Sequence, residues 1–172
     1  YYWRAWINID QNNYEKAIDD FNKVIELDSN YSNIYADRGT CYHFSKNYKK
    51  AAEDYIKALD INPMNIRIMN NLSELYIVTN NYHNAYVLSQ KTSNIPENNS
   101  IVLSLFLECI SGKLLGKKIK TPYDLLIDTL KKEPIIKEWS FEEMDNWLET
   151  TKISNENKKF ILDLINKMKQ KQ

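Results

Sequence analysis

The sequence contains little glycine or proline, with 3 Gly and 4 Pro among 172 residues, and no run of alternating β-branched residues. Sheet proteins need such turn formers and runs, so their scarcity predicts an all-helical protein. No stretch of 18 apolar residues is present, and no transmembrane helix is therefore expected. A helix-like pattern begins at Tyr1 without a charged and then apolar leader, so we expect no signal peptide here and interpret the start as a cut in a longer chain.

Charge of one sign is also missing, because 23 basic side chains balance 23 acidic ones. A basic surface drives binding to phosphates, so its absence argues against a nucleic acid partner. The sequence has no glycine-rich phosphate loop and no CxxC, HExxH or GxSxG motif. Its two histidines, His43 and His83, are far apart in the sequence. These absences predict a non-catalytic protein without a metal or a cofactor.

A pattern that recurs at a fixed step dominates the first half of the chain. It places an aromatic, a small, a second aromatic and a final aliphatic residue at fixed spacing, and three of these four positions keep their type in all three copies. The copies are Tyr14, Ala17, Phe21 and Leu27; Tyr48, Ala51, Tyr55 and Ile61; and Tyr82, Ala85, Ser89 and Ile95. The step from Tyr14 to Tyr48, and again to Tyr82, is the repeat period. This period and pattern resemble the tetratricopeptide repeat, a helix–turn–helix unit that stacks into a superhelix.

The resemblance covers about residues 1–99 and implies an all-α, right-handed α-solenoid of three helix–turn–helix repeats followed by a C-terminal helical appendage. The expected helices are 1–10, 14–27, 32–45, 48–60, 65–79, 82–93 and 100–115. The last of these arrives in phase as a fourth first helix and is apolar on most sides, which predicts a buried helix. We therefore expect a repeat array over residues 1–116 and an extension over 117–172 packed on its end.

The extension resembles no family, and its helices are predicted from local signals. A basic linker over 112–122 precedes a helix that Pro122 opens, with Thr121 as its N-cap, and that ends before Pro134. Ser140 begins a capping box for a helix to about Thr150. A final helix is expected over 154–169.

Small residues occupy the predicted crossing point of each helical pair, namely Ala5 with Ala17, Gly39 with Ala51, and Ser73 with Ala85. The third pair departs from the pattern, because Ser89, Thr92 and Ser93 replace Tyr55, Ala58 and Leu59. This predicts looser packing of that helix or packing against a different element. The acidic pairs Asp19-Asp20, Glu53-Asp54 and Glu142-Glu143 are interpreted as solvated helix faces.

The two cysteines, Cys41 and Cys109, are separated by two full repeat periods. Helices two repeats apart would stand roughly 20 Å from each other at about 8–10 Å per neighbour, beyond the ~7 Å limit for a disulfide. Two buried thiols in a reducing, cytoplasmic setting are the expected outcome.

In the tetratricopeptide family the first helices line a concave face that holds a segment of a partner protein. The corresponding positions are Tyr2, Trp3, Trp6 and Ile9; Asn33, Ala36, Asp37, Thr40 and His43; and Arg67, Asn70, Asn71, Glu74 and Ile77. Amide side chains beside one arginine suit a polypeptide ligand. The predicted peptide-binding residues are Asn33, Asp37, Arg67, Asn70, Asn71 and Glu74.

Family members that bind the acidic C-terminus of chaperones carry Lys and Asn in one first helix, Asn in the next, and Lys and Arg in the third. At these positions this sequence has Tyr2 and Trp6, then Asp37, then Arg67 and Asn71. Four of the five positions differ, and Asp37 would repel a carboxylate, so that partner is disfavoured. The leading hypothesis is a protein-interaction scaffold with neither a nucleic acid nor a membrane partner. The alternative is a structural subunit whose groove is filled by its own C-terminal helices or by another copy. Self-association through the first helix, which has more apolar side chains than one amphipathic face can bury, is a further alternative. An enzyme regulatory domain is a weaker third hypothesis.

Overall fold

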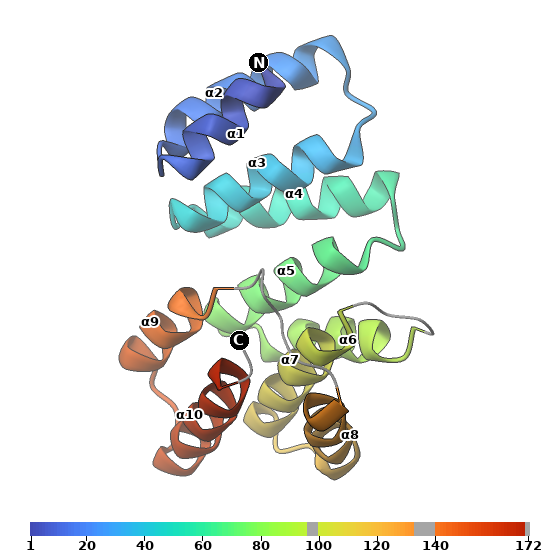
Figure 1. Ribbon diagram of the computed structural model, residues 1–172, viewed down its shortest axis with the longest axis vertical. Helices are drawn as coiled ribbons and strands as arrows, with labels where there is room; N and C mark the ends of the chain where they lie inside the picture. Colours follow the sequence, from blue (N-terminus) through green and yellow to red (C-terminus); the bar gives the residue numbers. More distant parts are fainter. Residues whose placement is uncertain (96–99, 133–139, 171–172) are drawn as a thin grey trace. The chain divides into compact units, whose positions relative to one another are not determined.

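The computed structural model describes residues 1–95, 100–132 and 140–170, and every regular element in these ranges is an α-helix (Figure 1). The chain divides into two compact units, which are residues 1–75 and residues 76–172. The division falls inside one helix, α5. The predicted boundary after residue 116 stays a prediction. The helices are α1 (Tyr2–Asp10), α2 (Tyr14–Leu27), α3 (Ser32–Phe44), α4 (Tyr48–Ile61), α5 (Ile66–Val78), α6 (Tyr82–Ser93), α7 (Ile101–Leu114), α8 (Lys120–Lys132), α9 (Glu142–Thr150) and α10 (Asn155–Lys169).

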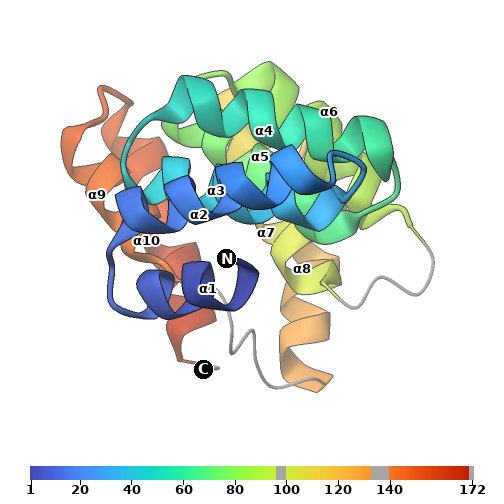
Figure 2. The same ribbon diagram turned by 90° about the horizontal axis from the view of Figure 1, so that it is seen from above.

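The first unit contains two antiparallel helical pairs, α1 with α2 and α3 with α4, and α2 packs on α3 (Figures 1 and 2). Small residues at the crossings are confirmed, since Ala5, Ala17 and Ala51 are fully buried. At Gly39 an added Cβ would lie 3.0 Å from the ring of Tyr55. The sequence therefore places small residues where the backbones approach most closely.

A left-handed residue closes the turn inside each helical pair, and these residues follow the repeat period. Asn12, Lys46 and Asn80 have φ of 59°, 59° and 61°. Asparagine tolerates this conformation better than most residues, whereas lysine is strained in it. Asn12 and Asn80 also accept a hydrogen bond through Oδ1 from the hydroxyl of a tyrosine two residues later, at 2.8 Å and 2.6 Å. The turn chemistry is thus built from asparagine at two of the three sites.

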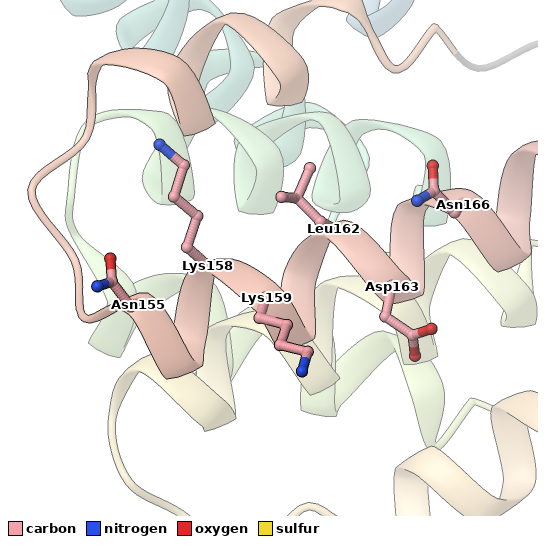
Figure 3. Close-up of a pocket in the computed structure, with 6 residues that line it drawn as sticks. All are labelled: Asn155, Lys158, Lys159, Leu162, Asp163 and Asn166. Atoms are coloured by element: carbon pink, nitrogen blue, oxygen red, sulfur yellow. The ribbon is translucent and has the colours of Figure 1, made fainter.

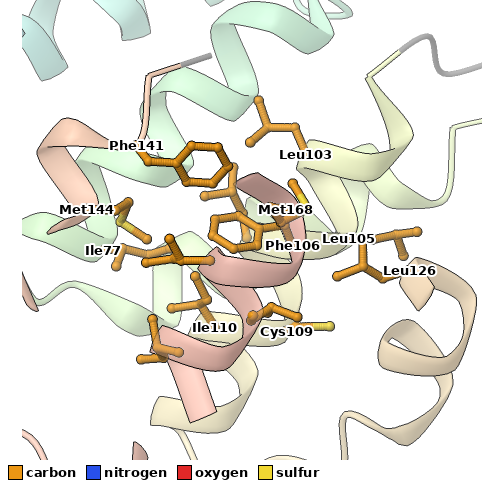
Figure 4. Packing of buried hydrophobic residues seen from close by; sticks show 14 of the residues in the cluster. Ile77, Leu103, Leu105, Phe106, Cys109, Ile110, Leu126, Phe141, Met144 and Met168 are labelled. Carbon is orange, nitrogen blue, oxygen red and sulfur yellow. The ribbon is translucent and has the colours of Figure 1, made fainter. Parts of the chain in front are cut away.

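The core of the second unit surrounds α7, which packs against α6, α8 and α10 (Figure 4). Ten consecutive residues of α7, Leu103 to Gly112, are buried, which confirms the prediction of a buried helix. Phe106 meets Phe141 edge to face, with ring centroids 6.0 Å apart. Trp147 of α9 lies beside Tyr82 at 6.4 Å, and its indole N–H points toward Oδ1 of Asn80 at 3.5 Å. Helices far apart in sequence thus share one apolar core.

The polar residues of α6 are satisfied within the helix rather than loosely packed. Ser89 and Thr92 are fully buried. The Ser89 hydroxyl donates to the carbonyl of Ala85 at 2.8 Å, and the Thr92 hydroxyl donates to that of Ser89 at 2.9 Å. Ser93 instead reaches α7, where its hydroxyl donates to the buried Glu108 carboxylate at 2.6 Å. Helix α6 packs on the apolar α7, the next helix in the chain, as α2 packs on α3.

Several predicted boundaries in the C-terminal part need correction. Helix α8 begins at Lys120, so Thr121 lies inside its first turn and is not the N-cap. Pro122 is tolerated there because the first turn of a helix has no acceptor for its N–H. The basic linker therefore shrinks to residues 115–119. The Ser140 hydroxyl does accept from the N–H of Glu142, at 3.2 Å, although Phe141 occupies the N-cap position. The predicted stop before Pro134 lies outside the described residues.

Candidate functional site

The candidate site centres on Asp37 of α3 and Arg67 of α5, which the sequence predicted to lie together. Arg67 Nη1 lies 3.6 Å from Asp37 Oδ1. The Asp37 side chain is buried, whereas half of the Arg67 side chain, 51%, remains exposed. Burial raises the pKa of Asp37 to about 6, although the nearby Arg67 opposes this rise. The pair therefore combines a half-exposed arginine side chain with a buried carboxylate.

The other predicted site residues divide between surface and interior. Asn33 is exposed and Asn71 is half-buried, so both can reach a partner. Asn70 and Glu74 are buried. Direct contact with a partner is thus available to Asn33, Arg67 and Asn71, while Asp37, Asn70 and Glu74 belong to the layer beneath them. The position of a residue within the repeat does not tell whether its side chain is accessible or buried. One face of a helix includes residues at the centre of an interhelical contact and residues at its edge.

A tyrosine anchors α4 against the α3 face of the site. Tyr55 is almost fully buried, and its hydroxyl lies 3.2 Å from Thr40 Oγ1. The Thr40 hydroxyl donates to the carbonyl of Ala36 at 3.0 Å, which leaves its oxygen to accept from Tyr55. Burial raises the pKa of Tyr55, so the phenol stays protonated and keeps this donor role. The bond fixes the α3 backbone one turn beyond Asp37.

Two tryptophans of α1 occupy the positions that correspond to Asp37 and Thr40 one period earlier. Trp3 is 77% exposed and Trp6 is 36% exposed. Three residues apart on a helix, they lie on one side of α1. His43, which the sequence placed near the same face, is instead buried, beside the rings of Tyr48 and Tyr55. It therefore serves packing and is not a contact residue.

Nothing in the described ranges gathers three or more metal-ligating side chains. A shallow hollow of about 420 Å³ runs along α10 (Figure 3) and is lined by Asn155, Lys158, Lys159, Leu162, Asp163 and Asn166. All of these belong to one helix, so no side chains converge on a bound molecule from different elements. Within the same described ranges, no helix has both the length and the apolarity to cross a bilayer.

The sequence interpretation missed an ion pair that repeats with the period. Arg4 donates to Asp20 from Nε at 2.9 Å, and Arg38 donates to Asp54 from Nε at 2.8 Å and from Nη2 at 2.6 Å. Asp20 and Asp54 are buried, which corrects their interpretation as parts of solvated faces. The signal was present in the sequence, because both the arginine and the aspartate recur after one repeat period.

The two carboxylates of these pairs differ in their environment. The hydrogen bond from Arg4 lowers the pKa of Asp20, whereas burial raises the pKa of Asp54 in spite of Arg38. Arg38 also donates from Nη1 to Asn22 Oδ1 of α2 at 2.6 Å, so the second pair lies beneath the first repeat. Both aspartates are buried, but the Arg4 side chain is 65% exposed and the Arg38 side chain only 18%.

Comparison with known proteins agrees with this geometry. Residues 1–31 and 32–65 match the tetratricopeptide repeat family model. PilF of Pseudomonas aeruginosa has a similar structure, with a TM-score of 0.69 and 15% identity over 99% of this chain and 86% of that one. PilW, described as a type IV pilus biogenesis factor, gives a TM-score of 0.66 and 16% identity over 99% of this chain and 75% of that one.

A third similar structure is YrrB, described as a TPR protein with an unusual peptide-binding site. It has a TM-score of 0.64 and 19% identity over 100% of this chain and 84% of that one. At these identities the likeness establishes the fold alone. No curated protein is similar to this chain in sequence. The matches identify residues 1–31 and 32–65 as two tetratricopeptide repeats, and the similar structures show a helical solenoid fold.

Proposed function

We propose that the chain is a non-catalytic scaffold that binds a segment of a partner polypeptide on the α3 and α5 surface around Arg67. The observation that carries this proposal is the Asp37–Arg67 pair. A buried carboxylate lies 3.6 Å from the arginine, while half of the Arg67 side chain remains exposed. Holding a charged side chain in place before binding lowers the entropy lost when a ligand arrives.

The neighbouring side chains suit an extended chain. Asn33 and Asn71 can both donate to and accept from the backbone of a peptide, and both are accessible. Trp3 and Trp6 of α1 would add apolar contact area, since exposed aromatic side chains are frequent anchors of binding interfaces. Arg67 would pair with an acidic side chain or a terminal carboxylate of the ligand. The repeats and the similar structures support protein binding in general, and two buried free thiols fit a reducing, cytoplasmic location.

The test is a peptide array probed with the full chain and with three charge-reversal variants. Arg67→Glu changes the proposed anchor, whereas Lys49→Glu and Lys57→Glu change exposed residues of α4, the outer helix. We expect peptides that contain an acidic residue to bind the unmodified chain and both lysine variants. Binding to Arg67→Glu should fall by at least about 30-fold, the equivalent of losing an anchor of about 2 kcal/mol.

Equal behaviour of the three variants toward every bound peptide would overturn the proposed site. A ligand set without acidic residues that is still lost on Arg67→Glu would retain the site but reject the carboxylate as the group it recognises.

A further inference from the structure

A hollow in the second unit is lined by two stretches that are far apart in the sequence, 78–82 and 147–152. It has a volume of about 480 Å³ and lies where the end of α5 and the start of α6 meet the C-terminal end of α9. Its apolar lining consists of Val78, Tyr82 and Trp147. Its polar lining consists of Asn80, Thr150, Thr151 and Lys152. Side chains therefore converge here from different elements, as they do in ligand sites.

The indole of Trp147 is buried but has only a long hydrogen bond. The side chain is 6% exposed, and its Nε1 lies 3.5 Å from Oδ1 of Asn80. Bonds from N–H to oxygen are usually about 2.9–3.0 Å long. The same Oδ1 already accepts a bond from the Tyr82 hydroxyl at 2.6 Å. An oxygen of a ligand in the hollow would therefore be a better acceptor for this indole N–H than Asn80 is.

Three further donors at the hollow have no acceptor among the residues that the structure describes. Lys152 is exposed and forms no ion pair there, and the Thr151 hydroxyl makes no hydrogen bond there. Asn80 uses Oδ1 to accept from Tyr82 and Trp147, which leaves its Nδ2 as a donor. The Thr150 hydroxyl differs, because it donates to carbonyls within α9.

The charge at the hollow favours an anion that carries one negative charge. No carboxylate lines it among the described residues, and Lys152 is the one charged side chain in its lining. The partial negative charge at the end of α9 is smaller than the full charge of Lys152, and the partial charges at the end of α5 and the start of α6 have opposite signs. One ammonium group matches one carboxylate, whose oxygens accept from N–H and O–H donors alike.

We infer that this hollow is a second binding site, which takes a carboxylate attached to an apolar group. The carboxylate accepts from Trp147 Nε1, from Lys152 Nζ and from the Thr151 hydroxyl, and its apolar group packs against Val78 and Tyr82. A small organic acid and the C-terminus of a polypeptide with an aliphatic last residue share this chemistry. All residues of the site belong to the second unit, so the inference is independent of the surface around Arg67.

The test follows the indole N–H signal of Trp147 in proton–nitrogen correlation spectra of the full chain, which has four tryptophans. Trp147→Phe assigns the signal by removing it. The probes are acetyl-Ala-Ala-Leu with a free C-terminal carboxylate, the same peptide as its C-terminal amide, and isocaproate. We expect at least one of the two carboxylates to shift this signal saturably and the amide to leave it unchanged.

Three variants locate the binding. Lys152→Gln should weaken it about tenfold or more, because it removes a charge-assisted hydrogen bond. Lys118→Gln makes the same change at an exposed lysine outside the hollow and should leave binding unaltered. Arg67→Glu should also leave it unaltered. This last variant separates a failure of the present site from a failure of the surface around Arg67, which is also proposed to bind carboxylates.

Tighter binding of the peptide than of isocaproate would identify a polypeptide C-terminus as the ligand, and equal or tighter binding of isocaproate would identify a small organic acid. The inference would be overturned if neither carboxylate gave a saturable shift, or if the amide bound as well as the free acid. A titration of Lys152→Gln that matched that of the unmodified chain would overturn it as well.

Discussion

Arg38 and Asp54 form a two-point ion pair beneath the first helical pair, with Nε and Nη2 donating at 2.8 Å and 2.6 Å. Replacing Arg38 with leucine leaves the Asp54 carboxylate buried without its partner. We expect a loss of about 3 kcal/mol in the free energy of unfolding, the usual cost of removing one member of a buried pair. Urea denaturation followed by circular dichroism measures this loss.

The third copy of the repeat provides a matched control, because it carries Leu72 and Leu88 where the second has Arg38 and Asp54. The double variant Arg38→Leu, Asp54→Leu should recover most of the stability lost by the single change, since two apolar residues leave no buried charge behind. A double variant as unstable as Arg38→Leu alone would show that the arginine contributes through its contact with Asn22 and not through Asp54.

The Asp37 carboxyl predicts a pH dependence with a definite sign. Its pKa is raised from 3.8 to about 6 in the folded chain, so between these values the folded state binds more protons than the unfolded state. Stability from this group is therefore present below about pH 4 and is lost as the pH rises to about 6. Relative to the unmodified chain, Asp37→Asn should gain up to about 3 kcal/mol across that window. Unfolding free energies measured at pH 4, 5, 6 and 7 test this. A difference that stays constant over the range would contradict the raised pKa.

The left-handed lysine at the second turn predicts a stabilising change. Lys46→Gly removes the steric strain of φ 59° while keeping the bond from its N–H to the carbonyl of His43 at 2.8 Å. The gain should be about 0.5–1 kcal/mol. Asn12→Gly is the control at the first turn, where asparagine already tolerates the conformation and accepts a bond from Tyr14, so no gain is expected. Melting temperatures of both variants decide the point, and equal shifts would argue against relief of strain.

Overpacking the α3–α4 crossing should destabilise the first unit. Ala51 is fully buried at the crossing, and Ala51→Leu forces the helices apart at a cost of about 1–3 kcal/mol. Glu53→Leu places the same side chain on the exposed side of α4 and should leave stability nearly unchanged. An unchanged melting temperature for Ala51→Leu would show that the crossing has room for the larger side chain.

The sequence predicted the helices as far as Ser93 almost to the residue, because the repeat period fixes both the crossings and the turns. It predicted the C-terminal helices less accurately, since only single capping residues define their ends. Thr121 illustrates this, because its hydroxyl suits an N-cap, yet α8 begins at Lys120. Local propensity favoured a start after Thr121, whereas α8, which packs on α7, begins one residue before it.

The sequence predicted which helical faces form the candidate site, but not which of its side chains are buried. Phase places Asp37, Arg67, Asn70, Asn71 and Glu74 on one side of their helices, but burial depends on the neighbouring helix, which phase does not describe. The Arg4–Asp20 and Arg38–Asp54 pairs were missed for the opposite reason. Acidic neighbours such as Asp19 and Asp20 look alike in sequence, and only the partner on the adjacent helix distinguishes the buried member.

The two cysteines are buried, one in each compact unit, and burial raises the pKa of each thiol to about 12. A thiol that is both covered and protonated reacts with an alkylating reagent only during transient opening of the structure around it. The alkylation rates of Cys41 and Cys109 therefore report local opening of the structure. Their separate alkylation rates, resolved by mass spectrometry of the two tryptic peptides, report how often each unit opens without any label or substitution being introduced.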